Sequence, residues 1–402
     1  MKILISTEVS SIHAARWINQ LAYQGIDIIV FQPIVSENRV NEDLKAGNLY
    51  LPLKVDNCKN LECKYSVPSI IGKTLLRMGK YGIKIFQSIH EKKMKKIIEK
   101  ENPDIIHSLG LNINWKNQCL PIMRCLNKLD RKISPKWLYS SWGTDLDYYA
   151  KLDKNKYEEV QLVLRNINYL ITECKRDYNL AIKMGFNKKF MGYFTGFGGV
   201  KKLYIEEANR SSKTSNRNKI LIKGRTVEDG DPVGRALNAL KVIRKCEDLL
   251  AGYEIVVQAS KRSGVIQNEI KIIRDNTKLN IYSISNLEYD HLMKIYAESK
   301  IFISLTVNDG IPSSLLEAMT YGVLPIFSNI DSIKEIIEDN INGLLVDPTS
   351  DKSINMALKK AINDNVFVDK AAIINKEMIS TIYSEDIIKD KVIKMYYSIL
   401  EN

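Results

Sequence analysis

The stretch NDGIPSSLLEAMTYGVLPIFSN, residues 308–329, is the most informative part of the sequence for the fold. It follows an apolar run at 301–305 that is typical of a buried strand. Pro312 and the two serines after it suit the start of a helix, and Gly322 suits the end of that helix. A second apolar run, at 324–327, follows at once. The order strand, helix, strand predicts part of a parallel α/β sheet.

The same alternation of strand-like and helix-like runs continues along most of the chain. Strands are expected at residues 2–6, 26–31, 103–108, 137–141, 169–172, 220–223, 254–258 and 280–284. Helices are expected at residues 13–24, 236–246, 288–298 and 314–321. We therefore predict an α/β protein with two doubly wound, Rossmann-like halves. Ligands of such sheets bind at the carboxyl ends of the strands, and two such domains facing each other place the active site in the cleft between them.

A polar stretch, EEANRSSKTSNRNK at residues 206–219, interrupts the alternation. It has no aromatic residue and is rich in Ser, Asn, Lys and Arg, a composition typical of a linker. We therefore predict an N-terminal domain at 1–205 and a C-terminal domain at 220–384. A final helix at 385–402 is expected to pack back toward the N-terminal domain. A chain of 402 residues is long for one core, which also favours two domains.

The composition is that of a soluble globular protein, with 45% hydrophobic and 26% charged residues. No apolar run reaches about 18 residues, so no transmembrane helix is expected. The apolar N-terminal stretch is too short for a secretory signal and is predicted to be the first strand. The six cysteines form no CxxC pair, so we expect reduced thiols in a cytoplasmic protein and no structural zinc.

The net charge of +12 comes entirely from the first half of the chain. Residues 1–200 carry 31 Lys and Arg against 19 Asp and Glu, whereas residues 201–402 carry 28 of each. The richest segment, 72–100, has nine basic and two acidic residues interleaved with apolar ones. This pattern fits either a solvated basic helix or peripheral contact with an anionic membrane or a phosphate-bearing acceptor. No nucleic-acid-binding motif accompanies the charge, so nucleic acid is not an expected partner.

Two acids, Asp309 and Glu317, lie on either side of the predicted helix start in the opening stretch. The free N–H groups at a helix N-terminus form an anion site, here at the carboxyl end of a strand. Glu317, about one turn inside, could simply interact with the helix dipole, which is worth about 0.3–1 kcal/mol. That alternative does not explain Asp309 and the turn Gly-x-Pro together.

This stretch resembles the nucleotide-sugar loop of the retaining GT-B glycosyltransferases marked by Glu, seven residues, Glu, which are family 4-like and belong to the glycosyl transferases group 1. Other pieces of the sequence are similar to that family in the same order. They are HAARWINQLAYQGIDIIVF at 13–31, PDIIHS at 103–108, SWGTDL at 141–146, GFGGV at 196–200, ILIKGR at 220–225 and NGLLVDP at 342–348. The resemblance covers nearly the whole chain and implies the GT-B fold.

The resemblance also implies roles in binding a nucleotide sugar. Glu317 would bind the ribose, and Asp309, one methylene shorter than the family's first Glu, would contact the donor sugar near its anomeric carbon. The backbone around Gly310, Ser313 and Ser314 would face the diphosphate.

Basic residues after the strand at 220–223 complete the implied diphosphate site. Arg225 matches the family's Arg, but the usual Lys-Gly is replaced by Asp229-Gly230. Arg235 is our candidate replacement, with Lys223 in reserve. Cations are needed there because the leaving diphosphate gains negative charge, which guanidinium groups bind with paired hydrogen bonds. These residues could instead be ordinary surface cations.

On the acceptor side, Trp142 replaces a His that the family often carries, and a tryptophan cannot act as a base. It could stack on a sugar or a lipid-linked acceptor. Asp145 is then the nearest ionisable group, and His13, at the start of the first predicted helix, is a further catalytic candidate. His107, at the end of a strand, is another candidate. Asp145 could alternatively be a helix cap.

Two Asp-x-Asp triplets, at 145–147 and 229–231, could suggest a metal site. We expect turn and cap roles for them, because arginines and a helix N-terminus are available to hold the diphosphate. No metal and no other cofactor is therefore predicted, and the nucleotide sugar is a co-substrate.

The resemblance implies a retaining hexosyltransferase that uses a UDP-linked donor. The basic first half of the chain favours a glycan or lipid-linked acceptor at the inner membrane face. Assembly of a surface polysaccharide or a glycolipid is the expected setting, with the protein cytoplasmic or peripheral on the inner membrane face. The alternative is a non-catalytic glycosyltransferase-like subunit that binds a nucleotide sugar or a partner enzyme. A nucleotide-sugar epimerase on the same scaffold is a weaker alternative.

Overall fold

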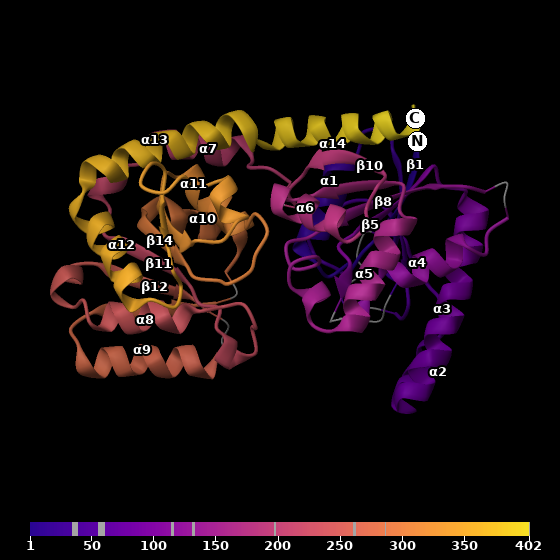
Figure 1. The fold of residues 1–402 in the computed structure, drawn as a ribbon, viewed down its shortest axis with the longest axis horizontal. Helices are drawn as coiled ribbons and strands as arrows, with labels where there is room; N and C mark the ends of the chain where they lie inside the picture. The colour runs from indigo at the N-terminus through magenta and orange to yellow at the C-terminus, as the bar shows by residue number, and fades with distance from the viewer. Residues whose placement is uncertain are drawn as a thin grey trace. The chain divides into compact units, whose positions relative to one another are not determined.

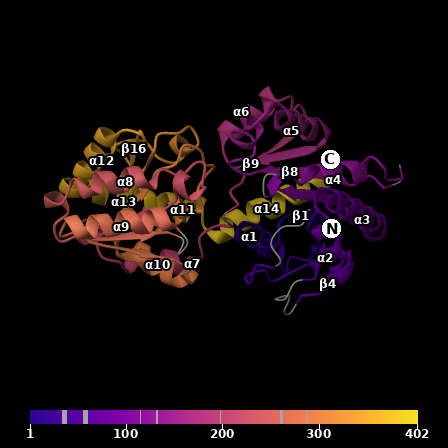
Figure 2. The same cartoon turned by 90° about the horizontal axis from the view of Figure 1, so that it is seen from below.

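A computed structural model of the chain describes residues 1–33, 39–54, 61–113, 116–130, 133–196, 198–259, 263–285 and 287–401. The chain divides into two compact units. Unit 1 is Met1–Gly198 with Lys389–Asn402, and unit 2 is Gly199–Ile388. Both units are layered α/β structures, with helices on both faces of a sheet (Figures 1 and 2).

Unit 1 is built on a parallel sheet of eight strands in the order β10-β9-β8-β5-β1-β2-β3-β4. The strands are β1 (Lys2–Ser6), β2 (Asp27–Phe31), β3 (Asn48–Leu51), β4 (Cys63–Tyr65), β5 (Ile105–Leu109), β8 (Lys136–Ser141), β9 (Tyr169–Thr172) and β10 (Lys189–Tyr193). A separate antiparallel pair joins β6 (Asn112–Ile113) and β7 (Lys116–Asn117). The helices are α1 (Ile12–Leu21), α2 (Ser69–Arg77), α3 (Gly79–Glu101), α4 (Cys119–Leu126), α5 (Lys154–Asn166) and α6 (Lys175–Lys183).

Unit 2 has a parallel sheet of six strands in the order β13-β12-β11-β14-β15-β16. The strands are β11 (Lys219–Lys223), β12 (Glu254–Gln258), β13 (Asn280–Ile284), β14 (Ser299–Ser304), β15 (Leu324–Ser328) and β16 (Leu344–Val346). The helices are α7 (Lys202–Arg210), α8 (Ala236–Arg244), α9 (Gly264–Asn276), α10 (Tyr289–Glu298), α11 (Ser313–Thr320), α12 (Asp351–Asn363) and α13 (Asn365–Ile382). Helices α8, α9 and α12 pack together, as do α11 and α13 with α7.

The strands predicted from the sequence are all present, and the doubly wound α/β class is confirmed. Apart from the edge strand β13, their side chains are mostly buried on both faces of the sheet, so they appear in the sequence as continuous apolar runs. The strands that the sequence did not predict are short, or they mix polar and apolar residues. In β4 and β10 no side chain is fully buried, and both are edge strands.

The boundary between the units lies ahead of the predicted linker. Residues 206–219 belong to unit 2, where α7 and a 3-10 turn at Thr214–Asn216 occupy much of that stretch. Tyr204 and Ala208 are buried, and α7 contacts α11 and α13. The polar composition therefore reflects the outer face of a packed helix rather than a free connection.

Helix α14 (Glu385–Leu400) begins in unit 2 and continues into unit 1. Its Tyr396 is fully buried, accepts a hydrogen bond from Trp17 Nε1 at 2.9 Å and lies 2.5 Å from His107 Nδ1. Lys136 Nζ donates to the Ile399 carbonyl at 2.6 Å, near the negative end of the helix dipole. The end of the chain is thus part of the core of unit 1.

The cysteines differ from the expectation of six reduced thiols. Cys119, Cys125, Cys174 and Cys246 are free and buried. Cys63 is disulfide-bonded, which the spacing of cysteines in the sequence did not indicate, because such a bond depends on the course of the surrounding loop. Cys58 lies outside the described residues.

Candidate functional site

The strand order of unit 2 identifies the place where a ligand would bind. It is the end of the sheet where the parallel strands finish, which we call the carboxyl edge. The chain runs outward from β11 through β12 to β13, and then returns to the other side of β11 with β14, β15 and β16. In such sheets ligands bind beyond the carboxyl ends of the strands where the order reverses, here between β11 and β14. Lys223 ends β11, and the loop 305–312 follows β14.

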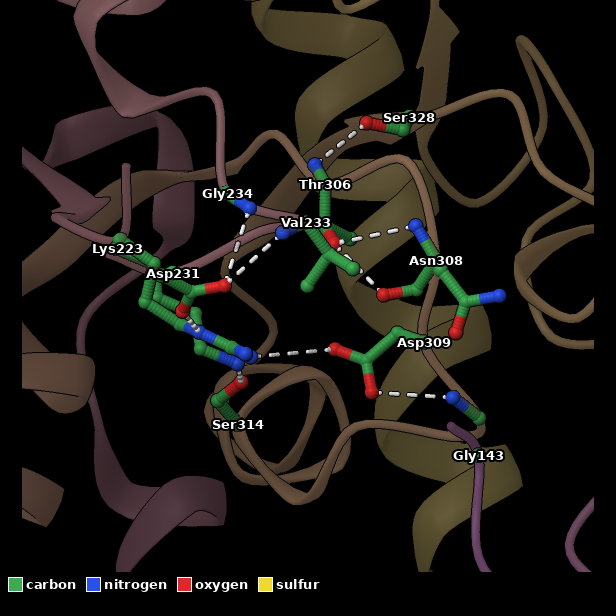
Figure 3. Close-up of polar contacts among 12 residues, drawn as sticks. Gly143, Lys223, Asp231, Val233, Gly234, Thr306, Asn308, Asp309, Ser314 and Ser328 are labelled. Carbon is green, nitrogen blue, oxygen red and sulfur yellow. Dashed lines mark hydrogen bonds and ion pairs between the residues drawn. The ribbon is translucent and has the colours of Figure 1, made fainter. Parts of the chain in front are cut away.

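Arg225 lies two residues beyond β11 and faces two carboxylates. Its Nε donates a hydrogen bond to Asp231, and its guanidinium lies 3.8 Å from the carboxylate of Asp309. Asp231 also accepts from the amides of Val233 at 3.1 Å and Gly234 at 3.2 Å (Figure 3). Arg225 is therefore held at the sheet edge from one side by an anchored acid, and points toward Asp309.

Gly234 allows the loop after β11 to fold back over Arg225. A Cβ atom at this glycine would lie 2.4 Å from the carbonyl group of Arg225, closer than any real side chain. The returning strand segment pairs with Thr306 after β14. The absence of a side chain at Gly234 thus brings the loop after β11 against the loop after β14.

Asp309 lies in the loop after β14, whose backbone is fixed by side chains. Thr306 N donates to Ser328 Oγ at 2.8 Å, and Ser332 Oγ donates to the Asp309 carbonyl at 2.7 Å. The Asp309 carboxylate accepts from the Gly310 amide at 3.0 Å. Asp309 is half-buried, so its carboxylate reaches the surface of the sheet edge from a rigid loop.

Helix α11 begins beside these residues. Its N-cap is Pro312, and no side chain caps the first amides of the helix. Ser314, in its first turn, accepts a hydrogen bond from Lys223 Nζ at 3.1 Å. Glu317 is on the same helix and is 4% exposed. Gly322, with φ of +69°, follows the C-cap as predicted.

The charges at this edge influence one another. Burial lowers the pKa of Lys223, with Asp309 acting in the opposite direction and Arg225 in the same direction. Burial raises the pKa of Asp231, but its hydrogen bonds with Arg225 and two amides outweigh burial and lower that pKa overall. Two cations therefore lie close together beside uncapped helix amides, an arrangement that suits a ligand with two or more negative charges.

Arg235 does not join this group in the way the sequence suggested. Its guanidinium donates to the carbonyls of Pro232 at 3.2 Å and Gly234 at 2.7 Å, within its own loop. Lys223, named as the reserve, contacts Ser314 instead. We therefore revise the second cation at this edge from Arg235 to Lys223.

Both acids of the Asp-x-Asp triplet at 229–231 accept hydrogen bonds from nearby protein groups. Asp229 accepts from Ser263 Oγ and from the Val265 amide at 3.4 Å, next to the start of α9. Asp231 holds Arg225, as described above. Among the residues that the structure describes, no group of three or more His, Cys, Asp or Glu side chains is arranged to hold a metal ion.

A second group of polar side chains gathers at the carboxyl edge of the sheet in unit 1. His13, in the first turn of α1, makes an edge-on ring contact with Trp142, with centroids 5.9 Å apart. The Trp142 ring lies over Gly110, where an added Cβ would be 2.9 Å from the ring. Trp142 Nε1 and the Cβ atom of His13 also lie beside Gly196. The structure thus brings together His13 and Trp142, from α1 and the end of β8.

Asp145 has a different role from the one predicted. Its Oδ2 accepts hydrogen bonds from Leu111 N at 2.8 Å, Tyr139 Oη at 2.9 Å and Trp142 N at 3.0 Å, and the residue is 2% exposed. A buried carboxylate with three donors is not available to take a proton from a substrate. We therefore revise Asp145 from a catalytic to a positioning residue that holds the Trp142 loop.

Glu173 was not singled out in the sequence. It follows β9, and its carboxylate accepts from the Gly143 amide at 2.9 Å and the Gly196 amide at 3.4 Å. It therefore ties two loops of the unit 1 edge together. The signal available in the sequence was its place directly after a predicted strand, among the ends of several strands.

His107 is part of the core rather than of this edge. It is fully buried between Tyr396 and Ser140, and burial lowers its pKa to about 3. Because Tyr396 accepts from Trp17, its own proton is free to go to His107 Nδ1, which leaves Nε2–H to donate to Ser140. The side chain is locked in a neutral, structural state.

Two α/β units of this kind define the class of proteins with the GT-B fold, and solved structures agree. A glycosyltransferase from Rickettsia africae superposes with a TM-score of 0.68 at 17% identity, covering 100% of this chain and 99% of that one. Sucrose-phosphate synthase from Thermosynechococcus elongatus gives 0.68 at 11% identity, with the same coverage. HepE of Anabaena in complex with UDP-glucose gives 0.67 at 12% identity, covering 99% and 100%. At such identities the likeness establishes the fold alone.

Two family models match the sequence and together span most of it. Glycosyl transferases group 1 matches residues 206–379, and glycosyl transferase 4-like matches residues 2–174. The chain therefore belongs to the group 1 glycosyltransferases with the GT-B fold.

One characterised relative, from Campylobacter jejuni, is 23% identical over 165 residues. It is the α-1,4-N-acetyl-D-galactosaminyltransferase that acts on GalNAc-α-(1→4)-GalNAc-α-(1→3)-diNAcBac-PP-undecaprenol. The match covers 41% of this chain and 44% of that protein, so the chain matches less than half of the relative's length.

Proposed function

We propose that this protein is a retaining hexosyltransferase that moves a sugar from a UDP-linked donor to a hydroxyl group of a glycan or lipid-linked acceptor. The observation that carries the proposal is the site at the β11–β14 edge of unit 2. There Lys223, Arg225 and the uncapped N-terminus of α11 surround the carboxylate of Asp309.

Each part of this site suits one part of a nucleotide sugar. Arg225 and Lys223 provide two cations for the diphosphate, and the amides at Ser313 and Ser314 provide further donors. Glu317, lying deeper on α11, is the acid we assign to the ribose hydroxyls. Asp309 is then the acid nearest the hexose. HepE of Anabaena, which shares the fold, has been solved with UDP-glucose.

The reaction needs the charges that this edge supplies. The bond from the anomeric carbon to the diphosphate breaks, and its electron pair leaves with UDP. A bond forms from that carbon to the acceptor oxygen on the same face, and the acceptor hydroxyl proton is released. Arg225 and Lys223 stabilise the charge that develops on the leaving diphosphate, and Asp309 stabilises the positive charge at the anomeric carbon.

The acceptor is assigned to the edge of unit 1. Trp142 offers an aromatic surface for a sugar ring, and its loop is held by Asp145 and Glu173. The relative from Campylobacter jejuni acts on an undecaprenyl-diphosphate-linked glycan, which favours a lipid-linked acceptor for surface polysaccharide or glycolipid assembly. We accordingly propose that the protein works at the cytoplasmic face of the membrane. No helix among the described residues is long and apolar enough to cross a bilayer.

We propose further that transfer requires no divalent metal and no other cofactor. The argument is that Arg225, Lys223 and the α11 amides already supply positive charge to the diphosphate. Activity in EDTA equal to that with added manganese or magnesium is the expected result. Activity lost in EDTA and restored by manganese would contradict this proposal.

A donor screen tests the function. Purified protein is melted with UDP-, GDP-, ADP- and CMP-linked sugars, and release of the nucleotide by transfer to water is measured in parallel. Binding at about 100 times the dissociation constant adds about 2.7 kcal/mol to stability, a readily measured shift. We expect a shift and slow UDP release with one UDP-sugar. Arg225→Ala should abolish both, whereas the exposed Arg210→Ala should change neither.

The outcomes separate the proposal from its alternatives. A shift without release, even with an undecaprenyl-diphosphate glycan present, would favour the non-catalytic subunit. No shift with any donor would contradict nucleotide-sugar binding. Where a product forms, the coupling constant of its anomeric proton, measured by NMR, shows whether the donor's configuration is retained or inverted.

A further inference from the structure

Helix α2 and the first turns of α3 expose an unusual number of large apolar side chains. Ile70 is 82% exposed, Ile71 51%, Met78 51% and Tyr81 69%, all within twelve residues. In Figure 1, α2 continues from the N-terminal end of α3 away from the sheet of unit 1. We call the exposed residues of 70–93 the α2–α3 surface.

The opposite face of α3 is firmly seated in unit 1. Phe86, His90, Met94 and Ile98 are buried at spacings of four residues, with His90 stacked on Phe31 at a centroid distance of 4.6 Å. His90 Nε2 also lies 2.6 Å from the carbonyl of Gln32. The exposed side chains of α3 therefore project from a helix that is anchored in unit 1.

The same surface is strongly basic. Arg77, Lys84, Lys92 and Lys93 are exposed. The carboxylates of α3 are directed elsewhere: Glu91 pairs with Arg124, Glu99 with Lys95, and Glu101 with Lys2. Within the described part of the chain, no ion pair joins Lys84, Lys92 or Lys93 to an acid. The positive charge of this surface is therefore available to a partner.

We propose that the α2–α3 surface is a docking element for an anionic lipid bilayer, with Ile70, Ile71, Met78 and Tyr81 entering the headgroup region and the basic side chains facing the phosphates. Scattered apolar and aromatic side chains with interspersed lysines suit this interface. A nucleic acid would use the charges but not the exposed isoleucines. The inference depends on unit 1 alone and holds whether or not the protein catalyses transfer.

Docking of this kind is reversible and depends on salt. Each lysine near the surface strengthens attraction to an anionic leaflet, and salt screens that attraction over about 10 Å at 0.1 M. The apolar side chains add affinity that salt does not weaken. Binding should therefore be strong to anionic vesicles at low salt and reduced, but not abolished, at high salt.

The first test removes the apolar side chains. The full chain is sedimented with vesicles of phosphatidylcholine alone and with vesicles that also contain phosphatidylglycerol. Ile70→Ser, Met78→Ser and Tyr81→Ser combined should lower binding to the anionic vesicles by about tenfold or more. The matched control combines Met356→Ser, Val366→Ser and Ile373→Ser in unit 2, where the side chains are 62%, 66% and 68% exposed, and should bind like the wild type.

The second test removes the charges. Lys84→Gln, Lys92→Gln and Lys93→Gln combined should weaken anionic binding by about 100-fold. The control with the exposed Lys154, Lys202 and Lys352 changed to Gln alters net charge equally and should bind like the wild type. Thermal melting verifies that each variant is folded. Equal losses in variant and control, equal binding to neutral vesicles, or no binding by the wild type would each overturn the proposal.

Discussion

Asp309 lies in the loop after β14 and Glu317 lies on α11, the helix that follows, and the surroundings of the two carboxylates differ. Asp309 is half-buried and faces Arg225 at 3.8 Å, whereas Glu317 is only 4% exposed on α11. In the proposed complex Glu317 contacts the ribose, which does not change during the reaction, and Asp309 is nearest the carbon that reacts. Substitutions at the two residues should therefore change different kinetic constants.

Glu317→Ala should mainly raise the KM for the donor. It removes hydrogen bonds to ribose that are equally strong in the ground and transition states, which are worth about 1.5–3 kcal/mol, or roughly 10- to 150-fold. Steady-state kinetics with varied UDP-sugar measure this. Glu338→Ala, an exposed acid in unit 2, is the control and should behave like the wild type. A large loss of kcat at unchanged KM would refute the ribose assignment.

Asp309→Asn should mainly lower kcat. It preserves shape but removes negative charge beside a carbon that becomes positive, which should cost on the order of 10²-fold with little change in donor affinity. Kinetics give kcat, and calorimetric titration gives the affinity. Asp331→Asn, exposed on the neighbouring loop, is the control. Turnover like that of the wild type would reduce Asp309 to a turn residue before α11.

At the scale of elements, α14 is the part whose placement depends most on a few contacts. Ile388, Val392, Met395 and Ile399 are buried on one side of it. Its polar contacts include those of Tyr396 with Trp17 and His107, and of Lys136 with the helix end. The fully buried hydroxyl of Tyr396 thus joins α14 to two side chains of unit 1 within a mainly apolar contact.

Tyr396→Phe should destabilise unit 1 by about 2–5 kcal/mol, because it leaves the Trp17 N–H and His107 Nδ1 buried without their partner. The matched control is Tyr397→Phe, one residue further on, where the side chain is 46% exposed and a change within about 0.5 kcal/mol is expected. Urea unfolding measures both. Equal effects would show that the hydroxyl of Tyr396 has no special part in seating α14.

At the scale of the whole molecule, the two units should respond differently to acid. Unit 1 contains two buried histidines, His90 and His107, whose pKa values burial lowers to about 4 and about 3. Unit 2 contains only His291, which is exposed. All four tryptophans of the sequence precede residue 199, so tryptophan fluorescence reports unfolding of unit 1.

Unit 1 should lose stability as the pH falls from about 6.5 toward 4. The unfolded chain protonates its histidines in this range while the folded unit does not, and each unit of pKa difference is worth about 1.4 kcal/mol. Burial raises the pKa of Asp177 to about 6, so the folded unit binds a proton there before the unfolded chain does as the pH falls. This gain in stability offsets part of the loss due to the histidines. Urea unfolding followed by fluorescence at pH 7 and pH 4.5 measures the difference.

Variants identify the groups responsible for this pH dependence. His90→Gln should reduce the pH dependence of unit 1 stability, and His291→Gln should leave it unchanged. A pH dependence that His90→Gln leaves intact would mean that other groups dominate.

Much of the fold could be predicted from the sequence because each central strand is a short apolar run that can be recognised without knowing its neighbours. A run such as that of β12 is apolar at successive positions, so its burial on both faces is visible in one short stretch. The start of α11 at Pro312 and its end before Gly322 are local for the same reason. The edge strands β4 and β10 lack this signal because they are only partly buried.

The roles of polar residues were less visible, because each depends on partners far away in the chain. The sequence by itself determined the alternation of strands and helices, and it placed Arg225 after one strand and Asp309 and Glu317 after another. Three contacts became visible only in the tertiary structure. Arg235 donates to carbonyls of its own loop, and Asp145 accepts from three donors. His107 contacts Tyr396, which is 289 residues further on. Periodicity and caps act over a few residues, whereas a buried polar group is satisfied by whatever the completed fold brings beside it.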